Sequence, residues 1–256
     1  MSKNLPALLD AAEVRVAEVL PSGMDPKRVM RLARMAIHKN PRIANCDPVS
    51  VIEAIMTASR LGLEIDSPVG GAHLVPFKGK CQMIPDYRGL IKLVLATGRV
   101  QKLVARPVYR GEKFQMIQGS REEIQHIPMY EGEKSDDDIV GFYAVATMVS
   151  GATTHEYASR EEVDKIRARS RAKDNGPWVT DFAAMGCKTM VKRLIKWLPV
   201  AGAVAEAVEH DNRAEGYVSG VMESDSAQEL LAARARESQA GMREVLEAEV
   251  VEPEEA

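Results

Sequence analysis

Residues 139–149, IVGFYAVATMV, form the clearest predicted β-strand in the chain. The run is almost wholly apolar and rich in β-branched and aromatic side chains, which favour strands. Ser150-Gly151 follows as a turn that leads into a second extended segment, Thr153–Tyr157. The two segments predict a pair of neighbouring strands in the second half of the chain.

Further extended segments lie on the N-terminal side of this pair. Residues 71–77 and 81–85 are predicted to be short strands around the turn Lys78-Gly79-Lys80. Residues 100–117 are also predicted to be extended, and a helix is expected between them over 86–98. The middle of the chain is therefore rich in strands.

Helices are predicted on both sides of this middle part. Asp-Pro pairs at 25–26 and 47–48 place an N-cap residue before a proline at the first helical position. Ser159-Arg160-Glu161-Glu162 matches a capping box, so a helix is expected through Arg171. A final long helix is predicted over 181–198. This order predicts an α+β fold, with N-terminal helices and an antiparallel sheet packed beside a long helix.

The charge is distributed unevenly along the chain. Residues 201–256 contain 4 Lys/Arg and 14 Asp/Glu, a net charge of −10, whereas residues 1–200 carry +7. We expect three parts along the chain. Residues 1–24 form an N-terminal helical segment that is a candidate protomer contact, and residues 25–200 form the folded core. Residues 201–256 form an acidic, partly disordered linker. Residues 226–250 are expected to form a helix within that tail. A basic body suits a polyanionic partner.

The sequence does not support several classes of protein. No apolar run approaches the roughly 20 residues of a membrane-spanning helix, and Met1–Asp10 does not resemble a secretory signal, so we expect a cytoplasmic protein. Leu74 stands where a phosphate-binding loop ending at Gly79-Lys80 needs its first glycine, so ATP hydrolysis is not indicated. The 3 cysteines and 5 histidines are scattered, and Asp136–Asp138 is interpreted as a solvated loop, so no metal or cofactor is expected.

The helix predicted over 181–199 carries the strongest candidate binding surface. At about 100° per residue, five polar side chains fall on one arc and the apolar ones, with Trp197 among them, fall on the opposite arc. The polar arc contains Lys188, Thr189, Lys192, Arg193 and Lys196. Such a column attracts an anion laid along it, although an ordinary solvated face is the alternative interpretation. Gly186 weakens this helix by up to about 1 kcal/mol and indicates close packing against a neighbour.

Two further segments combine cations with aromatic rings or free backbone amides. Residues 165–173, KIRARSRAK, contain five basic residues and precede Trp178, which either anchors the core or stacks on a base. Residues 77–90 place Lys78 and Lys80 at a hairpin tip and Tyr87-Arg88 at a helix start, where backbone amides favour an anion.

Four blocks of sequence resemble the RecT family of phage annealing proteins. They are residues 40–66 (NPRIANCDPVSVIEAIMTASRLGLEID), 70–93 (GGAHLVPFKGKCQMIPDYRGLIKL), 141–148 (GFYAVATM) and 177–199 (PWVTDFAAMGCKTMVKRLIKWLP). The resemblance covers about residues 25–200. It implies a fold related to Redβ and the eukaryotic recombination-mediator annealing proteins, with protomers assembled into rings or helical filaments on DNA.

The resemblance, taken with the basic segments, predicts a DNA-binding set. It comprises Lys78, Lys80, Tyr87, Arg88, Arg106, Arg167, Arg169, Arg171, Lys173, Trp178, Lys188, Thr189, Lys192, Arg193 and Lys196. The expected partners are single-stranded DNA, the annealed duplex intermediate, other copies of the chain, a phage exonuclease and a host single-strand binding protein, in a bacterial cell. The acidic tail is expected to dock a partner or to compete with DNA for the basic surface.

Three functions remain open at this stage. The first is ATP-independent annealing of complementary strands in homologous recombination, without hydrolytic activity. The second is a metal-dependent nuclease that uses carboxylates such as Asp86 and Asp136. The third is a non-enzymatic adaptor whose basic faces meet acidic proteins. The resemblance favours the first.

Overall fold

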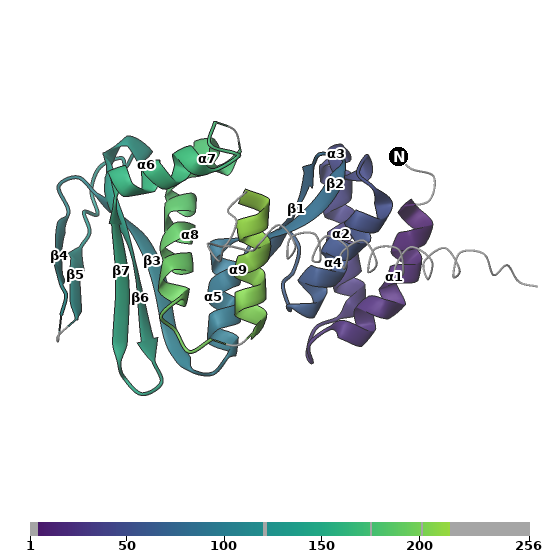
Figure 1. The fold of residues 1–256 in the computed structure, drawn as a ribbon, viewed down its shortest axis with the longest axis horizontal. Helices are drawn as coiled ribbons and strands as arrows, with labels where there is room; N and C mark the ends of the chain where they lie inside the picture. The colour runs from purple at the N-terminus through teal and green to yellow at the C-terminus, as the bar shows by residue number, and fades with distance from the viewer. Residues whose placement is uncertain (1–4, 120–121, 175, 201, 216–256) are drawn as a thin grey trace, which may run out of the picture. The chain divides into compact units, whose positions relative to one another are not determined.

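The structure is a computed structural model that describes residues 5–119, 122–174, 176–200 and 202–215. The described residues divide into two compact units, one up to Ile84 and the other from Pro85 onward. Each unit is described by itself. Figure 1 labels the helices and strands of both units.

The first unit is a set of helices followed by a hairpin. Its elements are α1 (Leu5–Val19), α2 (Pro26–Lys39), α3 (Pro41–Ala44), α4 (Pro48–Arg60), β1 (Ala72–Phe77) and β2 (Lys80–Pro85). The Asp25 side chain accepts a hydrogen bond from the Lys27 amide and Asp47 accepts one from the Ser50 amide, so both predicted Asp-Pro caps are confirmed. The predicted hairpin around Gly79 is confirmed as well.

The second unit contains the main sheet. Its strands are β3 (Val100–Tyr109), β4 (Lys113–Ile117), β5 (Glu123–Ile127), β6 (Ile139–Met148) and β7 (Thr153–Ser159). Its helices are α5 (Tyr87–Ala96), the 3₁₀ turn η1 (Asp136–Asp138), α6 (Arg160–Arg169), α7 (Pro177–Thr180), α8 (Phe182–Ile195) and α9 (Gly202–Glu215). Strand β6 lies between β3 and β7 in an antiparallel sheet, and β4 pairs with β5 in a separate hairpin. The predicted α+β fold with an antiparallel sheet beside a long helix is confirmed.

The two faces of the main sheet are covered by different elements, because successive side chains of β6 point to opposite faces. Helix α8 packs against β3, β6 and β7 on one face, and the β4–β5 hairpin lies on the other (Figure 1). Phe142 meets Phe182 of α8 on the helix side. Tyr143 points the other way and, with Tyr157, packs against Phe114 of the hairpin.

Close contact between α8 and β6 depends on Gly186. A Cβ atom added at this position would lie 2.3 Å from the ring of Phe142, which is 0% exposed. No real Cβ tolerates that separation, so only glycine lets the helix backbone approach the ring this closely. The close packing that the sequence indicated is thus a helix–sheet contact.

The hairpin is attached to the sheet through a buried carboxylate, Glu112. Its oxygens accept hydrogen bonds from the amides of Tyr109 and Met129 at 2.8 and 3.1 Å, from His126 Nε2 at 2.9 Å, and from Lys134 Nζ at 2.7 Å. Burial raises the pKa of Glu112, but these donors outweigh burial and lower it to about 2. The ionised carboxylate therefore holds four segments together.

One strand was missed and one prediction about an element needs correction. Strand β5 was not predicted, although Ile124 and His126 alternate with exposed residues along it. Residues 202–215 were predicted to belong to a linker and instead form α9, with Val204 and Ala207 buried. The predicted helix over 226–250 and the predicted disorder of the tail lie outside the described residues.

Within the part of the chain that the structure describes, no helix combines the length and apolar character needed to cross a membrane. All three cysteines carry free thiols and are buried. Burial raises the pKa of Cys187 to about 12, so this thiol stays protonated and packs as a small apolar side chain.

Substitution of Gly186 by alanine tests the contact with Phe142. The added methyl group raises helix propensity, but it cannot fit against the ring without displacing the helix, so we expect a net destabilisation of about 1–3 kcal/mol. The free energy of unfolding is measured by urea denaturation. Gly202→Ala is the matched control, because a Cβ there meets no described heavy atom within 4 Å. Equal stability of the two variants would contradict the packing argument.

Substitution of Glu112 by glutamine tests the buried carboxylate through the pH dependence of the unfolding free energy. Because the folded state lowers the pKa of Glu112 from an ordinary value of 4.5 to about 2, ionisation stabilises the fold fully above pH 4.5. That contribution disappears as the pH falls toward 2. The wild-type chain should exceed Glu112→Gln in unfolding free energy by at most about 3 kcal/mol at neutral pH, and the difference should shrink below pH 4.5. A difference independent of pH would refute this assignment.

Candidate nucleic-acid interface

Two lysines of α8 share one buried carboxylate from α9. Lys188 Nζ pairs with Asp211 Oδ1, and Lys192 Nζ lies 2.6 Å from Asp211 Oδ2. Asp211 is 0% exposed and Lys188 is 6% exposed. Burial raises the pKa of Asp211, but the two ammonium groups outweigh burial and lower it. We call this three-residue arrangement the α8–α9 clasp.

The clasp corrects the prediction of an open cation column on α8. Lys188 and Lys192 face α9 and have their charge partly neutralised there, so neither presents a free ammonium group to solvent in this structure. Thr189 donates its hydroxyl hydrogen bond back to the Met185 carbonyl at 3.0 Å. The error has one cause: α9 was not predicted, so its carboxylate was not available as a partner. The sequence did contain a signal for α9. Val204, Ala207 and Asp211 are spaced at i, i+3 and i+7, the pattern of residues on one buried face of a helix.

The C-terminal end of α8 presents a different arrangement. Glu156 of β7 accepts two hydrogen bonds through its carboxylate, from Arg193 Nε at 3.1 Å and from Trp197 Nε1 at 2.8 Å. Trp197 was predicted to lie on the apolar arc, yet it is 70% exposed. The helix-wheel argument fails because α8 ends at Ile195 and the following amides bond three residues back.

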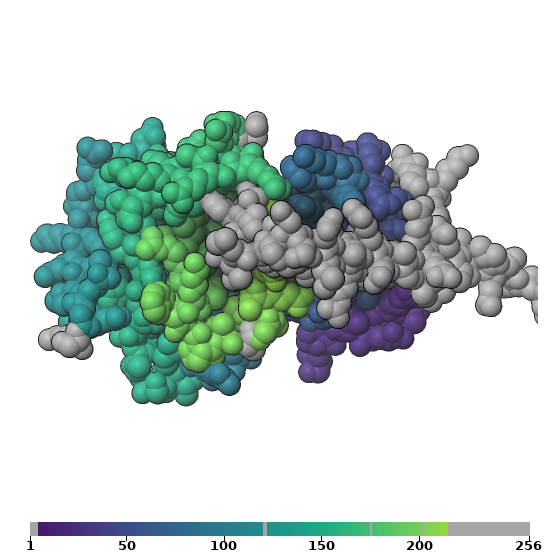
Figure 2. Space-filling view, in the orientation of Figure 1, coloured from purple at the N-terminus to yellow at the C-terminus, as the bar shows by residue number. Residues whose placement is uncertain are grey.

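Cations surround this end of the helix. Lys196 is exposed beside Trp197, and the exposed Arg99 donates from Nη1 to the Pro199 carbonyl at 3.3 Å. The end of α8 and the beginning of α9 are coloured light green in Figure 2, and they reach the surface on the face that it shows. Of the predicted α8 set, Lys196 and Arg193 therefore remain near solvent.

The basic segment 165–173, which comprises the end of α6 and the residues that follow it, lies at the opposite end of α8. The Arg167 guanidinium lies 5.9 Å from the ring centroid of Phe182, the first residue of α8, and its Nε donates to the Lys173 carbonyl at 3.0 Å. Arg169, Arg171 and Lys173 are exposed. At 1.5 Å per residue, Phe182, which Arg167 contacts, lies roughly 20 Å along the helix from Lys196.

Trp178 is part of the core. It is 1% exposed and packs against Phe182 with ring centroids 6.0 Å apart. Its Nε1 has no hydrogen-bond partner among the described residues. The prediction that Trp178 stacks on a base is therefore wrong for this conformation, and its alternative, a core anchor, is correct.

The remaining predicted residues are distributed over both units. Lys78 and Lys80 are exposed at the hairpin tip of the first unit. At the start of α5, Arg88 is exposed and its Nε donates to the Tyr87 hydroxyl at 3.3 Å. Asp86 caps this helix by accepting from the Gly89 amide at 2.6 Å, so a carboxylate already occupies the position predicted for an anion.

Arg106 lies on the hairpin side of the main sheet. Its β3 position pairs with Tyr143, and Lys102 pairs with Thr147 in the same register. Both basic residues are exposed. A cavity of about 230 Å³ lies between this sheet face and the hairpin, lined in part by Lys102, His126 and Tyr143. Arg106 is thus separated by the thickness of the sheet from the residues of α8.

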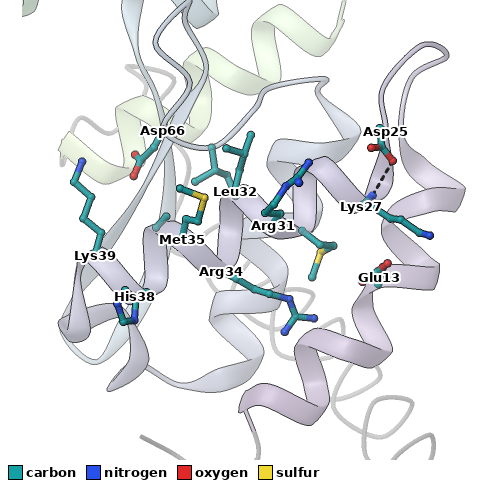
Figure 3. A pocket seen from close by; sticks show the side chains of 13 residues that line it. Glu13, Asp25, Lys27, Arg31, Leu32, Arg34, Met35, His38, Lys39 and Asp66 are labelled. Atoms are coloured by element: carbon teal, nitrogen blue, oxygen red, sulfur yellow. Dashed lines mark hydrogen bonds between the residues drawn. The ribbon is translucent and has the colours of Figure 1, made fainter.

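A cavity in the first unit lies along α2 and was not anticipated. It measures about 990 Å³ and combines an apolar floor, including Met30 and Ile65, with charges of both signs. Figure 3 shows Arg31, Arg34 and Lys39 together with Glu13 and Asp66 around it. Mixed charge over an apolar floor is more typical of a protein contact than of a track for a polyanion. No residue of the predicted DNA-binding set lines it.

The acidic residues named for a nuclease have structural roles. Asp86 caps α5, and Asp136–Asp138 form the 3₁₀ turn before β6. Over the described ranges, no group of three or more His, Cys, Asp and Glu side chains is placed to hold a metal ion.

An α+β core with exposed cations on several elements defines a candidate nucleic-acid-binding protein. The sequence model of the RecT family matches residues 27–225. The chain is 38% identical over 207 residues to protein RecT of Escherichia coli K12, covering 78% of this chain and 76% of that protein. It is 31% identical over 184 residues to the uncharacterized protein YqaK of Bacillus subtilis 168, covering 71% and 63%.

The chain belongs to the RecT family, as the resemblance of its sequence indicated. Membership supports its assignment as a single-strand annealing protein of DNA recombination. The match extends beyond residue 200, where the resemblance was expected to end, and it takes in α9 with Asp211. The clasp therefore lies within the matched region.

Substitution of Asp211 by asparagine tests the clasp. The change keeps the shape of the side chain but removes the charge that pairs with the buried Lys188 ammonium group and one carboxylate partner of Lys192, so we expect a loss of roughly 3–5 kcal/mol in unfolding free energy. Urea denaturation measures the loss. Glu209→Gln is the control on the same helix, because it removes only an exposed pair with Arg213, worth less than about 1 kcal/mol. Equal denaturation midpoints would show that the clasp contributes nothing.

Proposed function

We propose that this protein binds single-stranded DNA and anneals complementary strands without ATP hydrolysis. Family membership is the observation that carries the proposal. The exposed cations supply the physical means, because neutralising phosphates lowers the repulsion between two polyanions that must meet. Duplex formation is itself downhill, with stacking worth about 1.4 kcal/mol per step, so no nucleotide fuel is required.

The structure changes which residues support this proposal. Exposed candidates in the second unit are Arg169, Arg171, Lys173 and Lys196. Lys78 and Lys80 are exposed candidates in the first unit, and Arg88 and Arg106 complete the set in the second. Lys188 and Lys192 are not included, because the clasp engages both. A strand that contacts both ends of α8 would span about 20 Å of one protomer.

Binding along one strand is expected to involve several protomers. A homo-oligomer, as ring or filament, makes binding cooperative because each protomer places the next beside it. The proposed partners also include a phage exonuclease that exposes the strand and a host single-strand binding protein, within a bacterial cytoplasm. No hydrolytic activity is proposed for the chain itself.

The test is annealing of two complementary labelled oligonucleotides without ATP or metal. We expect annealing by the full chain and weaker binding by Arg169→Ala/Arg171→Ala/Lys173→Ala. If each cation meets a phosphate, the slope of log affinity against log salt should fall by up to about three times 0.7 for a single strand. Binding is measured by fluorescence anisotropy over a salt series.

The matched control removes three exposed cations elsewhere, through Arg110→Ala/Lys113→Ala/Arg213→Ala. This variant loses the same net charge, so an equal loss of affinity would mean that overall charge, not the α6 segment, determines binding. Magnesium-dependent loss of substrate would instead favour a nuclease. Binding without dependence on oligonucleotide length would favour an adaptor of acidic proteins.

A further inference from the structure

We propose that the indole of Trp197 is a stacking platform for an unpaired base of the bound strand. The inference rests on the proposed binding of single-stranded DNA and adds a contact that the predicted set did not include. Trp197 and Tyr130 are the most exposed large aromatic side chains among the described residues, at 70% and 90%. Trp197 differs in that its ring is held in place.

The orientation of Trp197 is fixed by Glu156. The indole Nε1 donates to Glu156 Oε1 at 2.8 Å, while the other carboxylate oxygen is held by Arg193 Nε at 3.1 Å. Glu156 belongs to β7 of the main sheet and its side chain is only 16% exposed, so the carboxylate that holds the indole is itself packed against the fold. A hydrogen bond at the edge of the ring leaves the rest of the indole in water. A preoriented aromatic surface loses little freedom when a ligand stacks on it.

The surroundings of Trp197 suit a nucleotide. Lys196 is exposed next to it, and Arg99 is tied to the backbone of Pro199 two residues further on. Cations beside an exposed ring satisfy the two needs of unpaired nucleic acid, phosphate neutralisation and a π surface for the base. An apolar protein partner would gain nothing from these charges.

Stacking also suits annealing chemically. A ring contacts the face of a base and makes no hydrogen bond with its Watson–Crick edge, so the edge stays available to a complementary strand. Because each base has a π face, the contact does not depend on sequence. A residue of this kind holds a strand in a form that is ready to pair.

The chain contains 2 tryptophans, and only one of them is exposed, which allows a direct optical test. In Trp178→Phe the emission comes from Trp197 alone. The change is conservative, because Trp178 Nε1 makes no hydrogen bond with the described residues and phenylalanine keeps a ring against Phe182. Labelled oligothymidylate is added to the full-length Trp178→Phe variant. The tryptophan emission, its quenching by acrylamide and the anisotropy of the oligonucleotide are then measured in the same titration.

We expect oligothymidylate to quench the emission of Trp178→Phe and to protect Trp197 from acrylamide, with the same midpoint as the anisotropy. Trp197→Phe, which retains Trp178, should bind the oligonucleotide without a change in emission. Comparison of the unsubstituted chain with Trp197→Phe gives the same information if Trp178→Phe does not fold.

Binding by anisotropy without any response of Trp197 would overturn this inference and leave the proposed function intact. Absence of binding by the unsubstituted chain would overturn both. Protection from acrylamide that rises with protein concentration in the absence of DNA would assign the ring to a contact between copies of the chain and would also overturn the inference.

Affinity provides the second measurement. Trp197→Ala should weaken oligothymidylate binding roughly 5- to 150-fold, the range expected for one lost stacking contact, and Trp197→Phe should retain much of the affinity. Val179→Ala is the control, because it truncates an exposed apolar side chain on α7. Unchanged affinity in Trp197→Ala would contradict the proposal.

Discussion

The close approach of α8 to the central strand is the constraint on which the second unit depends. It requires a position without a Cβ atom at residue 186, directly over Phe142. Once the helix is seated there, the directions of its other side chains are determined by the helix period. Lys188 and Lys192 then face α9, whereas Arg193 reaches Glu156 of β7. The absence of a Cβ atom at residue 186 thus allows α8 to lie where Lys188 and Lys192 pair with Asp211 while Arg193 and Lys196 stay near solvent.

Local signals in the sequence were sufficient for most of the fold. The Asp25 and Asp47 caps and the capping box at Ser159 were correctly predicted, because each is determined by a few neighbouring residues. The apolar run over 139–149 was also correct, since a strand buried on both faces needs no alternation. Helix α9 was missed because its Ala-rich, acidic sequence was interpreted as a linker, although such a composition equally favours a helix.

The candidate site was less predictable than the fold, because exposure is a tertiary property. A helical wheel identifies which residues share an arc but not what packs against it. Lys188 is buried by an element that begins 14 residues after it, and Trp197 is exposed because the helix ends before it. Trp178 illustrates the same difficulty: basic neighbours in sequence suggested a surface ring, yet the ring fills the core. The chemistry of each residue was predictable, but its accessibility was not.

The α8–α9 clasp has a consequence for the chemical reactivity of neighbouring amines. Reagents that acylate lysine attack the neutral amine at the surface, so the buried, paired Lys188 should be shielded while Lys196, the exposed residue directly after α8, reacts freely. The ratio of modification at these two positions reports whether α9 is attached, with the second lysine as an internal reference in the same molecule. Mass spectrometry of the modified chain would then follow detachment of the last described helix in solution without any substitution in the sequence.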